Sequence, residues 1–166
     1  DLFGNIITSP EKEAESHESA DSENPLLGGG GASKNIHNTP HDYTLVQTAI
    51  EIKDLIKYLS GFTEICFDTE TTGIDANDAE LVGLSFSVKP GEGFYIPCPD
   101  NTEGCNKLLN NFHPLFNDIS KTWIGHNIKY DMLMLKWYGI ELAGEIFDSM
   151  LAHFVIEPDG KNGMDA

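Results

Sequence analysis

The most informative stretch of this sequence is ICFDTETTG at residues 65–73. The stretch opens as a short apolar run and then places two acids, Asp68 and Glu70, two positions apart. Successive side chains of a strand point to opposite faces, so both acids lie on one face with Cys66, while Phe67 lies behind them. Carboxylates at the end of a buried strand are costly unless their charge is compensated, and Mg²⁺ binds such oxygen ligands well. The pattern predicts a metal-binding strand; its alternative is a solvated strand end.

A second cluster, GHNIKYD at residues 125–131, lies where a predicted strand meets a predicted helix. Asn127 is expected to cap that helix, and Asp131 follows on the same face one turn later. Asp131 is therefore a second candidate ligand, or else a surface acid favoured by the helix dipole. Lys129 is either a phosphate contact or a solvated lysine. His126 is a candidate general base, although a structural role beside the turn is the simpler interpretation.

Two further groups near these clusters have simpler structural interpretations. Asp148 is expected to cap a helix over residues 148–156, with support of the site as a second interpretation. Met132, Met134 and Trp137 are expected to belong to the core.

The order of the predicted elements indicates an α/β domain with a mixed sheet. Strands 65–71, 81–88 and 93–98 form a predicted antiparallel meander, because turn residues separate runs of apolar alternation. The other predicted elements are strands 43–47 and 122–125 and helices 49–59, 106–116, 128–138 and 148–156, assigned from apolar spacing and stop signals.

Composition limits the function classes that are open. The chain has 166 residues and a net charge of −17, with no basic face of the kind that marks a stand-alone DNA-binding protein. Its three cysteines form no CxxC pair, so neither a disulfide framework nor a zinc site is indicated. No apolar run approaches the length of a membrane span, and a reducing, cytoplasmic setting is expected. Residues 1–42 are acidic and glycine-rich and are expected to form a disordered, flexible linker before a domain at 43–166.

Five segments in one order, FDTETTG, LVGLSFSV, YIP, GHNIKYDMLML and FDSMLAHF, carry a family resemblance. Together they resemble the 3′–5′ proofreading exonuclease domain of bacterial DNA polymerase I, one of the ribonuclease H-like exonucleases. The resemblance runs from residue 43 to the end of the chain and implies a ribonuclease H-like mixed sheet flanked by helices. Asp68, Glu70 and Asp131 match three of the four acids of the family. The fourth would lie beyond Ala166, so an incomplete domain with weak metal binding and little activity is expected from these residues alone.

The resemblance also implies a chemistry and partners. Two divalent cations, Mg²⁺ or Mn²⁺, would be held by Asp68, Glu70 and Asp131 and would hydrolyse the 3′-terminal phosphodiester. The substrate would be a single-stranded or frayed 3′ end of DNA. The residues placed beside it are Thr69, Ile74, Asn127 and Lys129. The expected partners are the 5′-nuclease and polymerase domains of one parent chain in the bacterial cytoplasm, joined through the linker, with no membrane contact.

Alternatives from other classes remain open on the residues alone. A catalytically inert exonuclease-like scaffold would support a polymerase without cutting DNA, although the three retained acids argue against it. An RNA-trimming exonuclease of the same fold would use the same acids on another substrate. A dehalogenase-type phosphatase fits poorly, because its D-x-D-x-T motif requires an aspartate where Glu70 stands.

Overall fold

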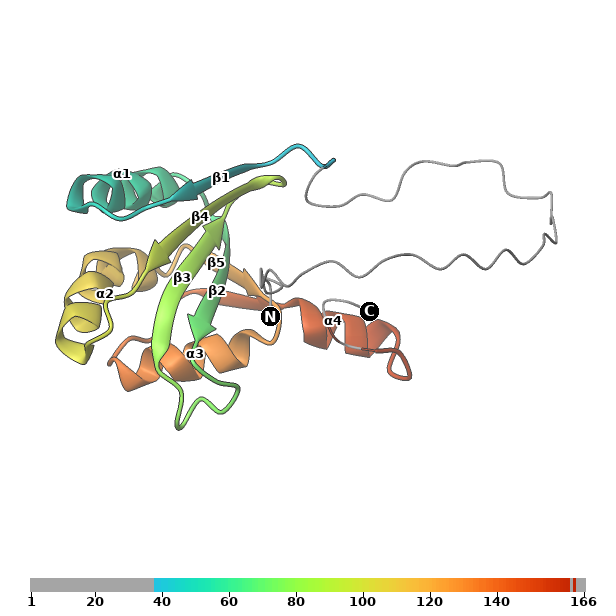
Figure 1. The fold of residues 1–166 in the computed structure, drawn as a ribbon. Helices are drawn as coiled ribbons and strands as arrows, with labels where there is room; N and C mark the ends of the chain where they lie inside the picture. Colours follow the sequence, from blue (N-terminus) through green and yellow to red (C-terminus); the bar gives the residue numbers. More distant parts are fainter. Residues whose placement is uncertain (1–37, 162, 164–166) are drawn as a thin grey trace, which may run out of the picture. The chain divides into compact units, whose positions relative to one another are not determined.

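The computed structural model describes residues 38–161 and 163 (Figure 1). The first strand begins at Asp42, one residue before the predicted start of the domain. The predicted flexible linker lies, up to residue 37, outside the described residues.

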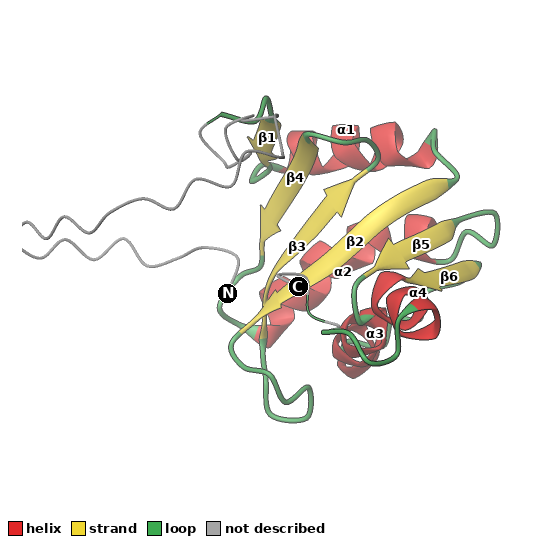
Figure 2. Ribbon diagram, turned by 90° about the vertical axis from the view of Figure 1, so that its right-hand side faces the viewer, coloured by secondary structure: helices red, strands yellow, loops and turns green. Residues whose placement is uncertain are grey.

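The described part of the chain folds as a mixed six-stranded sheet with four helices, which confirms the predicted α/β class (Figure 2). None of these helices is both long and apolar enough to cross a membrane. The elements in chain order are β1 Asp42–Leu45, α1 Ala49–Ser60, β2 Glu64–Thr71, β3 Leu81–Ser87, β4 Glu92–Pro97, α2 Thr102–Phe116, β5 Thr122–Gly125, α3 Ile128–Trp137, β6 Glu145–Asp148 and α4 Ser149–Ile156.

The strands lie in the order β1-β4-β3-β2-β5-β6, with β2 near the centre. Antiparallel pairing of β2 with β3 and of β3 with β4 confirms the predicted meander, whereas β5 joins β2 in parallel. The parallel edge strand β6 was missed by the sequence analysis, because its four residues are largely exposed and show no alternation. The residue before β6 must be a glycine. Gly144 has φ 92°, and it lies so close to the Lys121 carbonyl that a side chain at position 144 would collide with that carbonyl.

The core lies between the sheet and helices α1 and α2, which lie side by side (Figure 1), and it includes buried residues of α3. The alternation of β2 sends Phe67 into this core, where its ring meets Phe86 with centroids 5.2 Å apart. Phe86 stacks on Phe112 of α2 at 5.4 Å, and Phe116 lies edge-on to Phe67. This aromatic cluster packs one face of β2 against the core. Asp68 and Glu70 therefore lie on the other face of the strand.

Two helices differ from their predicted form. Helix α2 begins four residues earlier than expected, because the Asn101 side chain accepts a hydrogen bond from the Gly104 amide (2.8 Å) and caps it. Helix α3 buries Ile128, Asp131, Met134 and Leu135. Trp137 lies on the opposite side and is 65% exposed, so its assignment to the core was wrong.

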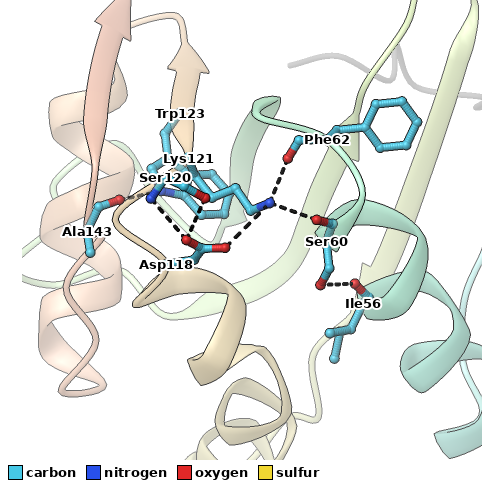
Figure 3. A network of polar contacts seen from close by, with 8 residues as sticks. All are labelled: Ile56, Ser60, Phe62, Asp118, Ser120, Lys121, Trp123 and Ala143. Atoms are coloured by element: carbon cyan, nitrogen blue, oxygen red, sulfur yellow. Dashed lines mark hydrogen bonds and ion pairs between the residues drawn. The ribbon is translucent and has the colours of Figure 1, made fainter.

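A buried lysine joins α1 to the segment that leads into β5 (Figure 3). Lys121 is 4% exposed, and its Nζ donates to the carbonyls of Ser60 (2.9 Å) and Phe62 (2.7 Å). Asp118 lies 3.5 Å from the same ammonium group. The Trp123 indole, two residues on, donates to the Ala143 carbonyl (2.9 Å). The network thus provides hydrogen-bond donors for carbonyls at the end of α1. It also links the end of α1 to the residue that precedes β5.

We expect Lys121→Met to lower the free energy of unfolding by about 2–4 kcal/mol, because two carbonyls lose their donor and Asp118 loses its counter-charge. The measurement is urea unfolding of the chain at neutral pH. Lys136→Met is the matched control, since this lysine is 69% exposed and its ion pair with Glu141 is long at 3.8 Å; its effect should stay within about 0.5 kcal/mol. Equal effects of the two substitutions would contradict the structural role of Lys121.

Candidate functional site

The last residues of β2 form one wall of the candidate site. Asp68 and Glu70 are half-buried on one face, opposite Ser85 and Gly83 of β3. Gly83 has no side chain to occupy this face, so the Tyr95 ring of β4 lies over it; a methyl group at position 83 would collide with that ring. Burial, and then the charge of Glu70, raise the pKa of Tyr95. The strand therefore presents its two acids on one face, as its alternation predicted, and the Tyr95 ring lies beside them.

Helix α3 brings the third acid to the same strand. The β5 ladder ends at the pair Cys66 and Ile124, so beyond Cys66 this edge of β2 has no strand neighbour. Asp131 takes the place of a neighbour: its Oδ1 accepts hydrogen bonds from the Thr69 amide (2.8 Å) and the Thr69 hydroxyl (2.6 Å). Asp131 is only 2% exposed, which rules out the alternative of a surface acid.

The surroundings of Asp68 and Asp131 favour the protonated form of both acids. Burial raises the pKa of Asp68; the charge of Glu70 raises it further, while nearby His126 lowers it. Burial raises the pKa of Asp131 to about 7, with a contribution from Asp68 that the Thr69 hydrogen bonds partly offset. No described lysine forms an ion pair with any of the three acids. For both Asp68 and Asp131, burial is the larger cause of the raised pKa, and the charge of a neighbouring acid adds to it.

That Asp68, Glu70 and Asp131 together hold divalent cations stays a prediction. Within residues 38–161 and 163, no group of three or more His, Cys, Asp or Glu side chains could hold a metal ion. The Asp131 carboxylate is instead held by the Thr69 amide and hydroxyl. The donor set still fits hard divalent cations, because it consists of carboxylate oxygens whose burial disfavours their charge. Asp68 and Glu70 on β2 and Asp131 on α3 are the residues that could hold such ions.

The four residues predicted to lie beside the substrate occupy different positions. The Thr69 side chain is buried and hydrogen-bonded to Asp131, so a contact from it to substrate stays a prediction. Ile74 lies in the loop after β2 and is 98% exposed, and Lys129 is exposed on α3. Asn127 stands at the start of α3, but its φ is 59° and its side chain makes no capping hydrogen bond, so the predicted cap was wrong.

Two contributors to the site were missed or undervalued by the sequence analysis. The Tyr130 hydroxyl donates to the Gly73 carbonyl (2.5 Å) and lies 2.8 Å from the Thr71 hydroxyl, so it ties the loop after β2 to α3. Asp148 caps α4 as predicted and also accepts a hydrogen bond from the Asn127 amide (3.0 Å). No local sequence pattern predicts the contact of Tyr130 with Gly73 or that of Asp148 with Asn127. The only signal is that Tyr130 and Asp148 occur in the quoted motifs.

Sequence comparison places the chain among known nucleases. Residues 43–166 match a family model described as 3′-5′ exonuclease. DNA polymerase I of Borreliella burgdorferi is 36% identical over 126 residues, which cover 74% of this chain and 14% of that protein. DNA polymerase I of Pseudomonas aeruginosa is 36% identical over 124 residues, covering 70% of this chain and 14% of that protein. The chain thus spans only a small part of the length of these relatives.

Solved structures confirm the ribonuclease H-like exonuclease fold. Brucella melitensis NrnC superposes with a TM-score of 0.56 at 17% identity, over 76% of this chain and 57% of that one. A Trypanosoma brucei RNase D complex with RNA U12 superposes with a TM-score of 0.59 at 15% identity, over 70% and 40% of the two chains. At these identities the likeness shows the fold alone. The family match and the identity to the bacterial polymerases show more: the chain belongs to the 3′-5′ exonuclease family and is homologous to the exonuclease region of DNA polymerase I.

Proposed function

We propose that this chain removes the 3′-terminal nucleotide of a DNA strand by metal-dependent hydrolysis and thereby proofreads during DNA replication or repair. The observation that carries the proposal is the buried Asp131, held by the residue between Asp68 and Glu70. An acid in such an environment is costly for the fold, and bound cations would offset that cost. Homology to the exonuclease region of DNA polymerase I supports the choice of reaction.

Each acid has a separate role in the proposal. Two bound cations, Mg²⁺ or Mn²⁺, would generate a hydroxide nucleophile and stabilise the leaving 3′ oxygen. Asp68 would be shared between the two ions, and Glu70 would bind the first ion and orient the attacking water. Asp131 would hold the second ion through a water molecule while its Oδ1 stays on Thr69.

The substrate in this proposal is a single strand that enters beside the loop after β2. Exposed Ile74 would pack against a terminal base, because every base offers an apolar face to such contacts. Asn127 would contact the terminal nucleotide, and Lys129 would contact a phosphate. Thr69, which lies between the two acids in the sequence, would also contact the substrate. A mismatched end frays more readily and therefore reaches such a site more often. Because this chain has a net charge of −17, partner domains would supply most of the positive surface that binds the DNA backbone. These partners are proposed to be a polymerase and a 5′-nuclease domain of one chain in the bacterial cytoplasm.

An RNA-trimming activity is the second candidate, and one observation favours it. The Trypanosoma brucei RNase D neighbour was solved with RNA and shares this fold. DNA is the stronger choice, because the sequence identity to the DNA polymerases is twice that to these structural neighbours.

The test is digestion of 5′-labelled DNA and RNA strands of one sequence by the complete gene product. With Mg²⁺ we expect stepwise shortening of the DNA from its 3′ end, slower shortening of the RNA, and neither in EDTA. A duplex with a mismatched 3′ terminus should be shortened faster than its matched counterpart. Faster digestion of the RNA would favour the second candidate. Absence of any metal-dependent shortening would leave the inert scaffold as the better account.

A further inference from the structure

The turn between β5 and α3 has a backbone conformation that its own side chains do not explain. Asn127, with φ 59° and ψ 38°, is the one non-glycine residue in the described chain with positive φ. Asparagine tolerates the left-handed region better than most residues, but this region still costs free energy and persists only when the surroundings fix it. The Asn127 side chain provides no capping hydrogen bond, so the support must come from another element.

That support comes from the junction of β6 and α4. Asp148 is paired in register with Gly125, which places its carboxylate beside the turn, and its Oδ1 accepts from the Asn127 amide (3.0 Å). The neighbouring Ser149 hydroxyl donates to the Gly125 carbonyl (3.1 Å) and lies 3.1 Å from Nδ1 of His126. Three successive residues of the turn therefore each contact Asp148 or Ser149.

The turn sets the start of α3 and thus the place of Asp131. Helix α3 begins at Ile128, directly after the left-handed Asn127, and Asp131 lies in its first turn. A helical turn is stiff, so a change in the direction of its first residues moves Asp131 relative to Thr69. The 2.6 Å and 2.8 Å hydrogen bonds from Thr69 to Asp131 depend on that direction.

We infer that Asp148 is a positioning residue of the nuclease site: by holding the Asn127 amide, it fixes the start of α3 and sets where Asp131 meets Thr69. This inference rests on the proposed function for its effect on rate, but its structural part can be tested separately. A helix cap alone does not account for the geometry. Capping explains the bonds to the Met150 (2.9 Å) and Leu151 (3.3 Å) amides, whereas the Asn127 amide lies in the turn before a different helix, α3.

Three variants of the complete gene product separate positioning from capping. Asp148→Ala removes the acceptor, and Asp148→Asn keeps an acceptor oxygen. Asn101→Ala removes the matched cap of α2, whose side chain accepts a hydrogen bond from the Gly104 amide of its own helix. All are assayed at a temperature where circular dichroism shows them folded. The readouts are kcat, the Mg²⁺ concentration for half-maximal rate, and hydrogen exchange of the Thr69 amide.

We expect Asp148→Ala to lower kcat by about tenfold or more and to raise the half-maximal Mg²⁺ concentration by about fivefold, as supporting residues around metal ligands do. Its Thr69 amide should exchange about tenfold faster, because the hydrogen bond to Asp131 opens more often. Asp148→Asn should stay within about threefold of the unmodified protein in each readout, and Asn101→Ala within about twofold.

Unchanged Thr69 exchange in Asp148→Ala would overturn the inference, whatever the enzyme assay shows. So would an unchanged Mg²⁺ requirement in an active protein, or an equal loss in Asp148→Asn. If the unmodified gene product degrades no 3′ end, the proposed function fails instead, and the Thr69 exchange still decides whether Asp148 positions Asp131.

Discussion

Replacing Asp68 with alanine is expected to lower the rate of 3′-nucleotide removal by about a thousandfold or more. In the proposed mechanism Asp68 would help to hold both cations, which would supply several kcal/mol of transition-state stabilisation. Since about 1.4 kcal/mol corresponds to a tenfold change in rate, a loss of about 4 kcal/mol gives this factor. Fold stability should change little or increase, because burial already disfavours the charge of Asp68.

The measurement is single-turnover degradation of a 5′-labelled strand by the complete gene product with Mg²⁺. Asp100→Ala is the matched control, because this exposed acid follows β4 and contacts none of the three candidate ligands. Where the gene product also extends primers, the rate of nucleotide addition should be the same in both variants. A rate for Asp68→Ala within tenfold of the unmodified protein would show that Asp68 does not hold the catalytic ions.

Replacing Asp131 with asparagine is expected to stabilise the metal-free chain at pH 8 while removing exonuclease activity. Burial raises the pKa of Asp131 from 3.8 to about 7, so the folded state keeps a proton that the unfolded state has released. Between about pH 4 and pH 7 the unfolded state therefore binds fewer protons, and the free energy of unfolding falls as the pH rises. At about 1.4 kcal/mol per pKa unit, the total loss is on the order of 4 kcal/mol.

Urea unfolding in EDTA at pH 4.5 and pH 8 checks this sign. The amide side chain introduced by Asp131→Asn would retain an oxygen for the Thr69 donors, so the variant should match the unmodified chain at pH 4.5 and exceed its stability at pH 8. Asp78→Asn, in the exposed turn before β3, is the control for the loss of one charge. A stability difference that does not vary with pH would contradict the raised pKa of Asp131.

The local parts of the site could be predicted because they follow from strand alternation and motif order. Asp68 and Glu70 share a face because side chains two positions apart in a strand point the same way. Phe67, between them and Cys66, points to the opposite face and into the core. The meander from β2 to β4 could be predicted because turn residues separate its alternating runs.

The remaining parts depend on contacts that no local pattern encodes. Thr69 and Asp131 are 62 residues apart, and their hydrogen bond exists only because β5 stops pairing at Cys66 and leaves an edge for α3. Strand β6 is four residues long and gains its order from β5. Trp137 was wrongly assigned to the core because the buried face of α3 includes a charged residue, Asp131. An apolar pattern does not place a charged residue on the buried face, so it assigns other positions of the helix to the core.

Asp68, Glu70 and Asp131 are proposed to hold divalent cations. Anomalous diffraction from crystals of the complete gene product, soaked in Mn²⁺ with a 3′-terminal nucleotide, would locate these ions. Mn²⁺ is chosen because it takes the oxygen ligands of Mg²⁺ and scatters anomalously. We predict two manganese peaks, both within coordination distance of Asp68, one of them also bound by Glu70 and the other nearer to Asp131. Peaks elsewhere in the molecule, with none against Asp68 and Glu70, would contradict the claim.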